Sequence, residues 1–161
     1  MYTIDHLGIA VKSLAQSKKF YEQLGLRVHP EEEVAQEKVR LAMVPVGESR
    51  IELLEPTADD SPIARFLAKR GEGLHHVCLH VDDLAGTVER LKRDGVRLIN
   101  EQIQVGAGGH LYVFVHPSSA CGVLLELCED QPRCVKDVPR RHGGTENPVI
   151  GRSGQRLIKD P

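Results

Sequence analysis

The chain consists of two similar halves, and this internal repeat limits the possible folds more than any other feature. Residues 4–11 (Ile-Asp-His-Leu-Gly-Ile-Ala-Val) align with residues 74–81 (Leu-His-His-Val-Cys-Leu-His-Val), so that His6 and His76 occupy equivalent positions. A second alignment pairs the closing segments of the halves: residues 51–53 with 125–127, and Glu52 with Glu126. Such repeats are typical of supersecondary units that bury their apolar faces against one another. We therefore expect two copies of one unit.

Both halves show the same order of predicted elements, a strand, a helix and then several strands. In the first half, hydropathy predicts a strand over residues 2–11, a helix over 13–24, and strands near 26–33, 38–45 and 49–55. In the second half, it predicts a strand at 74–81, a helix over 83–94, and strands near 96–104, 110–116 and 122–128. Between them, Ser61 and Pro62 begin a linker helix over 61–70 that Gly71 ends. Apolar periodicity then disappears, so residues 130–161 are predicted to form a flexible C-terminal tail.

Composition excludes several classes of protein. With 161 residues and 40% hydrophobic content, the chain can bury a core, yet no apolar run approaches the ~18–20 residues of a membrane span. Met1 leads directly into a strand-like segment, so we expect no export. A net charge of -2 and an aromatic content of 4% speak against nucleic acid as a partner. Because none of the four cysteines forms a C-x-x-C pair, a reducing, cytoplasmic location is favoured over a disulfide framework or a thiolate zinc site.

Strand alternation predicts where the histidines of the repeat point. Ile9 and its apolar neighbours two residues away are assigned to the face that packs against the following helix. His6 then lies on the opposite face, together with Ile4. The same rule directs His76 away from the helix and His75 towards it.

A pseudo-twofold relation between the halves would bring the equivalent positions together near its axis, and these positions hold two imidazoles and two carboxylates. A carboxylate inside so apolar a strand as that of Glu52 or Glu126 is costly to bury unless it is paired or bound to a metal. Together with His6 and His76, these residues form a donor set that suits Co, Mn, Fe, Ni or Zn. We therefore predict one four-ligand metal site.

Simpler interpretations exist for each residue alone. A single histidine on a strand is more often a hydrogen-bonded residue than a ligand, and Glu52 could pair with Arg40 or Arg50 on an edge. The repeat favours the metal site, because chance would not place the same two residue types at matching positions in both halves. The other histidines have weaker claims: His75, His80, His110 and His116.

From about residue 3 to residue 129, the sequence resembles the vicinal oxygen chelate superfamily and, within it, the methylmalonyl-CoA epimerases. The histidine strand and the closing glutamate are shared by the superfamily, whereas the Ser-Pro-Ile-Ala helix leading into Gly-Leu-His-His resembles the epimerase branch. The segments that carry the resemblance are residues 4–11, 51–56, 61–67, 73–77, 116–117 and 122–127.

The resemblance implies an α+β, glyoxalase-like fold of two tandem βαβββ modules, about 1–56 and 73–129, forming a cupped mixed β-sheet around a metal site. It implies His6, His76 and Glu126 as metal ligands with Glu52 at the fourth position. The implied metal is divalent: Co²⁺ first, with Mn²⁺, Ni²⁺, Zn²⁺, Fe²⁺ or Mg²⁺ as alternatives. The implied protein is a homodimer that interconverts (S)- and (R)-methylmalonyl-CoA, an acyl-CoA substrate, through proton abstraction at C2.

Inverting C2 requires a proton carrier on each face of the carbon. Glu126 is predicted as one of them. Some epimerases carry a second glutamate where this sequence has Leu41, which cannot carry a proton. Glu52 or a metal-bound water could then serve the other face, and the sequence leaves this choice open.

The sequence also leaves open other interpretations of one turn and of the function. Residues 106–109 could form a phosphate-facing glycine turn, although a plain hairpin turn is the more common use of such a sequence. The rival functions are a glyoxalase I-type lactoylglutathione lyase and a non-enzymatic, metal-free ligand-binding module of the same fold. Ethylmalonyl-CoA is a possible additional substrate.

Overall fold

The structure is a computed structural model that describes residues 1–106 and 109–130. The predicted tail, apart from Asp130, lies outside the described residues, as do Ala107 and Gly108 of the glycine turn. The first half contains β1 (Tyr2–Ala10), α1 (Leu14–Gln23), β2 (Glu32–Val34), the 3-10 helix η1 (Ala35–Glu37), β3 (Val39–Val46) and β4 (Ser49–Pro56). The linker helix is α2 (Pro62–Arg70). The second half contains β5 (Gly73–Val81), α3 (Leu84–Arg93), β6 (Gln104–Val105), β7 (Leu111–Val115), the 3-10 helix η3 (Pro117–Ser119) and β8 (Leu125–Glu129).

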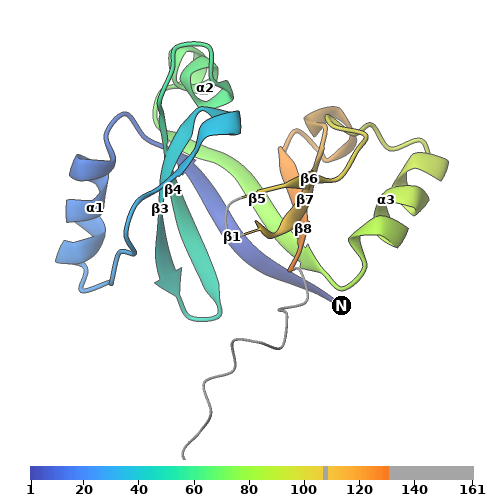
Figure 1. Cartoon of the computed structure of the whole chain (residues 1–161), viewed down its shortest axis with the longest axis horizontal. Coiled ribbons are helices and arrows are strands. Elements are labelled where there is room, and N and C mark those ends of the chain that lie inside the picture. Colours follow the sequence, from blue (N-terminus) through green and yellow to red (C-terminus); the bar gives the residue numbers. More distant parts are fainter. Residues whose placement is uncertain (107–108, 131–161) are drawn as a thin grey trace, which may run out of the picture.

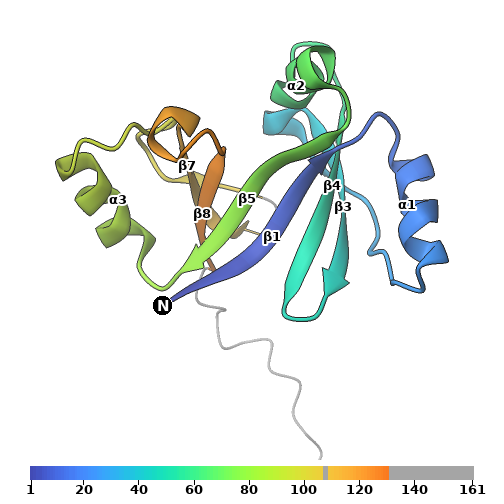
Figure 2. The same cartoon turned by 180° about the vertical axis from the view of Figure 1, so that it is seen from behind.

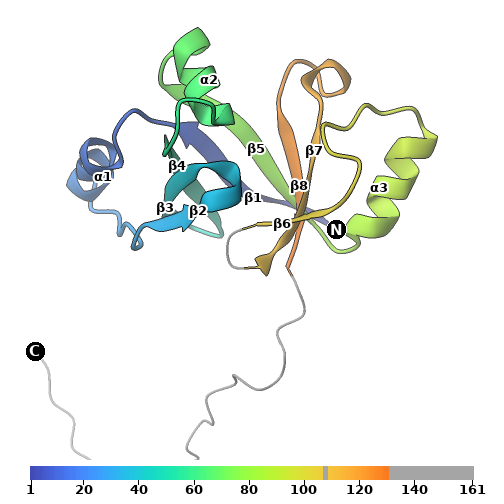
Figure 3. The same ribbon diagram turned by 45° about the horizontal axis from the view of Figure 1, so that its top comes forward.

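All eight strands form one mixed sheet in the order β2-β3-β4-β1-β5-β8-β7-β6. The two histidine strands, β1 and β5, pair antiparallel at its centre, and each pairs in parallel with the closing strand of its own half, β4 or β8. Read outwards from the centre, both halves therefore have the same strand order. The sheet curls so that β3 and β4 stand on one side of β1 and β5, and β7 and β8 on the other (Figures 1 and 3). This arrangement confirms the predicted α+β fold with a cupped mixed sheet.

The helices begin and end where the sequence predicts. The side chains of Ser13, Ser61 and Asp83 accept hydrogen bonds from backbone N–H groups of the first turns of α1, α2 and α3. An additional contact ties α1 and α3 to the sheet at equivalent points. The N–H of Leu14 donates to Glu55 at 2.5 Å, and the N–H of Leu84 donates to Glu129 at 2.7 Å.

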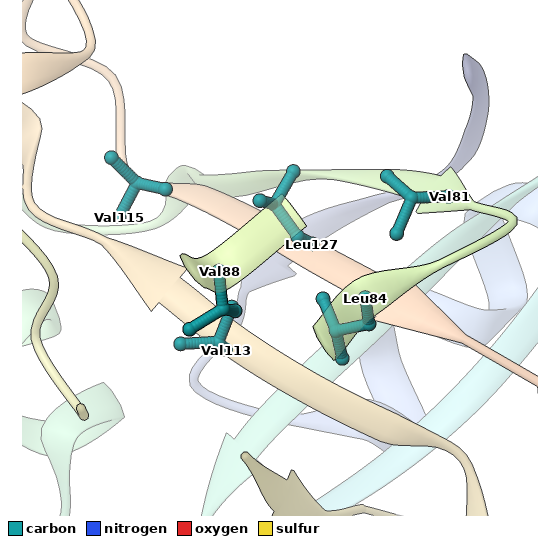
Figure 4. Packing of buried hydrophobic residues seen from close by; sticks show 6 residues of the cluster. All are labelled: Val81, Leu84, Val88, Val113, Val115 and Leu127. Carbon is teal, nitrogen blue, oxygen red and sulfur yellow. The ribbon is translucent and has the colours of Figure 1, made fainter. Parts of the chain in front are cut away.

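Each flanking helix covers an apolar cluster on the outer face of its half. Beneath α3, residues from the helix and from β5, β7 and β8 point towards one another (Figure 4): Val81, Leu84, Val88, Val113, Val115 and Leu127. Beneath α1, Val11 and Leu14 pack with β3 and β4, and Ile9 packs against this cluster. The assignment of Ile9 to the helix-facing side is thus confirmed. No helix in the described part of the chain is long and apolar enough to cross a membrane.

Two predicted strands are much shorter in the structure. The strand expected near 26–33 is reduced to β2, and that near 96–104 to β6 and an isolated bridge between Leu98 and Val115. The apolar residues that suggested these strands pack onto the helix clusters instead: Leu26 and Val28 beneath α1, and Val96, Leu98 and Ile103 beneath α3. Their periodicity therefore reflects burial rather than strand pairing.

Candidate metal centre and cleft

The structure brings together the four side chains that the repeat singles out. His6 lies on β1, Glu52 on β4, His76 on β5 and Glu126 on β8, and all four are buried. The Nε2 atoms of His6 and His76 are 3.1 Å apart. Oε2 of Glu126 lies 3.1 Å from Nε2 of His76 and 3.6 Å from Nε2 of His6. Oε2 of Glu52 lies 3.5 Å from both nitrogens.

This geometry fits a divalent metal ion. An ion with bonds of about 2.0–2.2 Å holds neighbouring ligand atoms roughly 3.0–3.5 Å apart in tetrahedral or octahedral geometry. The five separations given above lie at or close to this range, and the donor atoms of His6, Glu52 and His76 all lie within 4.8 Å of one another. Neutral imidazole and carboxylate donors suit the later first-row transition metals.

The electrostatics also call for a cation between the two carboxylates. Burial opposes charge on His6, but hydrogen bonds with Asp5 and Glu126, and the nearby negative charges, raise its pKa to about 10. Burial likewise opposes charge on Glu126, yet His6 and His76 lower its pKa to about 2. For Glu52 burial prevails and raises the pKa. The buried carboxylates therefore favour positive charge at this point, which a divalent metal ion would provide.

Two β-bulges between β1 and β5 direct the histidines into the cup. The pairing passes from Ile4 opposite Leu79 to His6 opposite Cys78, so β1 has one extra residue, Asp5. It then passes from Gly8 opposite His76 to Ile9 opposite Leu74, so β5 has one extra residue, His75. Asp5 and His75 are repeat-equivalent, since each directly precedes a histidine of the centre.

The bulges overturn two sequence predictions. His75 was expected to face the helix that follows its strand, α3. It instead lines the cup, where its ring packs edge-on against Phe66 of the linker helix α2 at 5.0 Å. Ile4 was expected to share a face with His6, but it lies opposite Leu79, on the outer face, and is 51% exposed. In a regular strand, successive side chains alternate between the two faces of the sheet. In both cases the extra residue of the bulge shifts this alternation by one position, so that the side chain lies on the other face.

Asp5 and His75 each contact the Nδ1 atom of one central imidazole, the ring nitrogen that does not face the centre. His6 Nδ1 donates to Oδ1 of Asp5 at 2.7 Å, and Arg50 also donates to that oxygen. A carboxylate in this position fixes the tautomer of a ligand histidine and makes Nε2 a stronger donor to metal. Although burial opposes it, the bonds from His6 and Arg50 lower the pKa of Asp5 well below its usual range. Asp5 was not singled out from the sequence, although the repeat aligns it with His75.

His75 supplies the corresponding bond in the second half. Its Nδ1 lies 2.9 Å from Nδ1 of His76. Because Nε2 of His76 faces the centre, Nδ1 of His76 is the donor and Nδ1 of His75 accepts. Burial and the neighbouring His76 lower the pKa of His75 to about 4, which keeps it neutral.

A cleft of about 440 Å³ opens at the centre and is lined there by Glu52, His76 and Glu126. Most of its wall is apolar: Val39, Leu41, Leu54, Ile63, Phe114 and Leu124. Its polar members include Glu37 of η1 and Tyr112 of β7, and the Tyr112 hydroxyl donates to Oε1 of Glu37 across the two halves. Burial and Glu37 raise the pKa of Tyr112 above its usual range. Neither residue was singled out from the sequence, since only the folded sheet brings them together.

The remaining histidines and cysteines take different places. His110 also lines the cleft, with Nε2 at 3.9 Å from Oε1 of Glu126. His116 caps η3. Cys78 and Cys128 are free, buried thiols, and the hydrogen bond between them together with burial raises the pKa of Cys78. Cys134 lies outside the described residues.

The cupped sheet and its central His/Glu cluster define a glyoxalase-like domain, and comparison with known proteins agrees. Residues 5–114 match the Glyoxalase/Bleomycin resistance protein/Dioxygenase superfamily. The chain belongs to this superfamily and, within it, to the methylmalonyl-CoA epimerase family, as the relatives below show.

Three relatives illustrate this membership. Methylmalonyl-CoA epimerase, mitochondrial, of Bos taurus is 38% identical over 126 residues, which cover 77% of this chain and 72% of that protein. The uncharacterized protein YqjC of Bacillus subtilis is 40% identical over 130 residues, or 80% of this chain and 93% of that one. The structure of a Ser-to-Thr variant of Streptomyces coelicolor methylmalonyl-CoA epimerase with 2-nitronate-propionyl-CoA superposes with a TM-score of 0.75 at 35% identity, covering 79% of this chain and 93% of that one.

Proposed function

We propose that this chain is a metal-dependent epimerase that interconverts (S)- and (R)-methylmalonyl-CoA by removing and returning the proton on C2. The observation that carries the proposal is the buried centre of two imidazoles and two carboxylates at the base of an apolar cleft. The relatives named methylmalonyl-CoA epimerase, one of them with a bound acyl-CoA analogue, support the choice of substrate.

The reaction places negative charge next to the thioester once C2 loses its proton. A divalent metal held by His6, Glu52, His76 and Glu126, with Co²⁺ as our first choice, supplies a Lewis acid for that charge when it is bound. Asp5 and His75 orient the two imidazoles. The apolar wall excludes water from the carbanion and leaves room for the methyl group.

Glu126 is suited to carry the proton on one face of C2. Its Oε2 faces the imidazole nitrogens, whereas its Oε1 faces His110 in the cleft. One carboxylate oxygen can therefore bind the metal while the other exchanges a proton with the substrate. Glu52 directs Oε2 at both imidazoles, and we assign it chiefly to the metal.

The test is exchange of the C2 hydrogen of methylmalonyl-CoA for deuterium from solvent. We expect exchange in the Co²⁺-loaded enzyme, its loss with a chelator and its return with added Co²⁺. Glu126→Gln should abolish exchange by the face it serves while keeping the fold, as judged by circular dichroism. Turnover of the glutathione hemithioacetal of methylglyoxal would instead indicate a lactoylglutathione lyase. A protein that binds no metal and catalyses neither reaction would be the ligand-binding module.

The same proposal includes a homodimer. Between the clusters beneath α1 and α3, against which Ile9 and Leu79 pack, the outer face of β1 and β5 is not covered by a helix of the described residues (Figure 2). It pairs Ile4 with Leu79, Leu7 with Val77 and Ile9 with Leu74. Leu74 is 55% exposed in the single chain, which favours a second copy against this face. Sedimentation should give a dimer for the wild type and a monomer for Leu74→Glu; a monomeric wild type would refute the dimer.

A further inference from the structure

A second group of metal-ligating side chains lies beside the four-ligand centre. It consists of Asp5, Cys78 and Cys128, and one ligand atom from each lies within 4.8 Å of the ligand atoms of the other two. Cys78 and Cys128 are free thiols, 0% and 3% exposed, and they hydrogen-bond to each other. The proposed epimerase reaction uses neither thiol, so this group calls for an explanation of its own.

Strand alternation explains why the two thiols meet. Cys78 follows His76 by two residues on β5, and Cys128 follows Glu126 by two residues on β8. Residues two apart on a strand lie on the same face of the sheet, so both thiols point into the cup, next to the centre. The two strands are neighbours in the sheet, which brings the two sulfur atoms together.

The repeat shows that the fold of the half does not require a thiol at either position. In the first half, the positions equivalent to Cys78 and Cys128 hold Gly8 and Leu54. A glycine and a leucine have no side-chain atom that binds a metal ion. The pair of thiols is therefore a property of the second half alone.

Asp5 completes the group from β1. Among the described residues, the hydrogen bonds of its side chain come from His6 and Arg50, and both end on Oδ1. Its second carboxylate oxygen, Oδ2, is thus left for a further bond. The side chain of Asp5 is 15% exposed, which gives an ion access from solvent. Arg50 brings positive charge to this carboxylate, but its own side chain is 42% exposed and can turn away into solvent.

The donor set differs in kind from that of the centre. Thiolate sulfur prefers soft cations such as Zn²⁺ and its heavier relative Cd²⁺, and a carboxylate oxygen serves as a further ligand to them. Zn–S bonds of about 2.3 Å and Zn–O bonds of about 2.0–2.2 Å place tetrahedral ligand atoms roughly 3.4–3.8 Å apart. Small rotations of three side chains whose ligand atoms already lie within 4.8 Å of one another produce this arrangement.

We propose that Asp5, Cys78 and Cys128 form a second metal site, which binds a thiophilic divalent cation of the Zn²⁺ and Cd²⁺ class. The cation binds Oδ2 of Asp5 and the two sulfur atoms, with water as its fourth ligand, and each thiol releases its proton to solvent. The site adjoins the centre, because Oδ1 of the same carboxylate accepts the hydrogen bond of His6.

The test is a titration of the full chain with Cd²⁺, followed by the ultraviolet charge-transfer absorption of thiolate–Cd²⁺ bonds, which imidazole and carboxylate ligands do not give. The centre is first filled with one equivalent of Co²⁺, and Cys121 and Cys134 are replaced by Ser, so that two thiols remain. We expect one equivalent of Cd²⁺ to produce the absorption while Co²⁺ stays bound. Cys78→Ala and Cys128→Ala should each weaken Cd²⁺ binding by about 100-fold or more, and Asp5→Asn by about 10-fold.

The two alanine variants should keep the circular dichroism and the Co²⁺ affinity of the parent protein, which shows an intact fold and centre. Absence of the absorption in the parent protein would make the thiols small apolar core residues and overturn the site. Absorption that survives in Cys128→Ala would also overturn it, because the ion would then lie on Cys78 with His6 and Glu126, whose ligand atoms lie within 4.8 Å of one another as well. The readout is metal binding, so a chain that gives the absorption but does not exchange C2 hydrogen would overturn only the proposed function.

Discussion

Gly8 provides a severe test of the centre, because the ring of His76 lies directly on it. A Cβ atom at position 8 would lie 2.2 Å from Cε1, 2.4 Å from Nδ1 and 2.6 Å from Nε2 of that ring. Carbon atoms in contact are normally about 3.5–4.0 Å apart, so Gly8→Ala requires a relative shift of roughly 1 Å. The backbone of β1 cannot supply it easily, since hydrogen bonds hold Gly8 between β4 and β5. The ring of His76 must move instead.

A shift of this size removes His76 from the centre. Metal–ligand distances tolerate deviations of about 0.2 Å, and the Nε2 atom of His76 now lies 3.1 Å from both His6 and Glu126. We therefore expect Gly8→Ala to weaken Co²⁺ binding by at least about 100-fold, as strongly as His76→Ala. Overpacking should also lower the free energy of unfolding by about 1–3 kcal/mol.

Calorimetric titration with Co²⁺, together with thermal unfolding of the metal-free protein, measures both effects. Gly47→Ala is the matched control. Position 47 has a positive φ of 62° but nothing within 4 Å of an added Cβ, so it should lose roughly 1–2 kcal/mol of stability without any change in Co²⁺ affinity. Wild-type Co²⁺ affinity in Gly8→Ala would show that β1 does not fix the position of the His76 ring and would refute this prediction.

Three further predictions concern single groups. Asp5→Asn should lower Co²⁺ affinity about 10–100-fold by weakening the orientation of His6, as measured by calorimetry; unchanged affinity would refute this role. In an alkaline absorbance titration, Tyr112 should ionise above the usual value of about 10, and Glu37→Gln should bring it closer to that value. Because folding raises the pKa of Tyr112, its contribution to stability is complete below about pH 10 and decreases at higher pH. Leu84→Ala should cost about 2–5 kcal/mol in denaturant unfolding, because Leu84 is fully buried beneath α3; a loss below 1 kcal/mol would contradict the packing in Figure 4.

The convergence of four side chains could be predicted from the sequence because the repeat places the same two residue types on equivalent strands of both halves. His6 and His76 lie on the two strands that meet at the centre of the sheet, and the closing strands pair with them in parallel. The face of His75 could not be predicted, because a bulge adds one residue without any mark in the hydropathy pattern. Nor could the contact between Glu37 and Tyr112, since it depends on how far the sheet curls.

The equivalent positions at which the two halves carry different residues affect the proposed reaction as much as those at which they carry the same residue. The positions that coincide, imidazole with imidazole and carboxylate with carboxylate, suit a cation, which requires no distinction between the halves. The positions that differ each change what surrounds that cation: Asp5 against His75, Gly8 against Cys78, and Leu41 against Tyr112. An epimerase must treat the two faces of C2 differently, because an acyl-CoA substrate has only one direction of entry and its two epimers are not mirror images. A strictly symmetric cup would offer identical groups to both faces. We therefore expect that exchanging Leu41 and Tyr112 between the halves would preserve Co²⁺ binding, because neither side chain belongs to the centre; a large loss of Co²⁺ affinity in calorimetry would refute this.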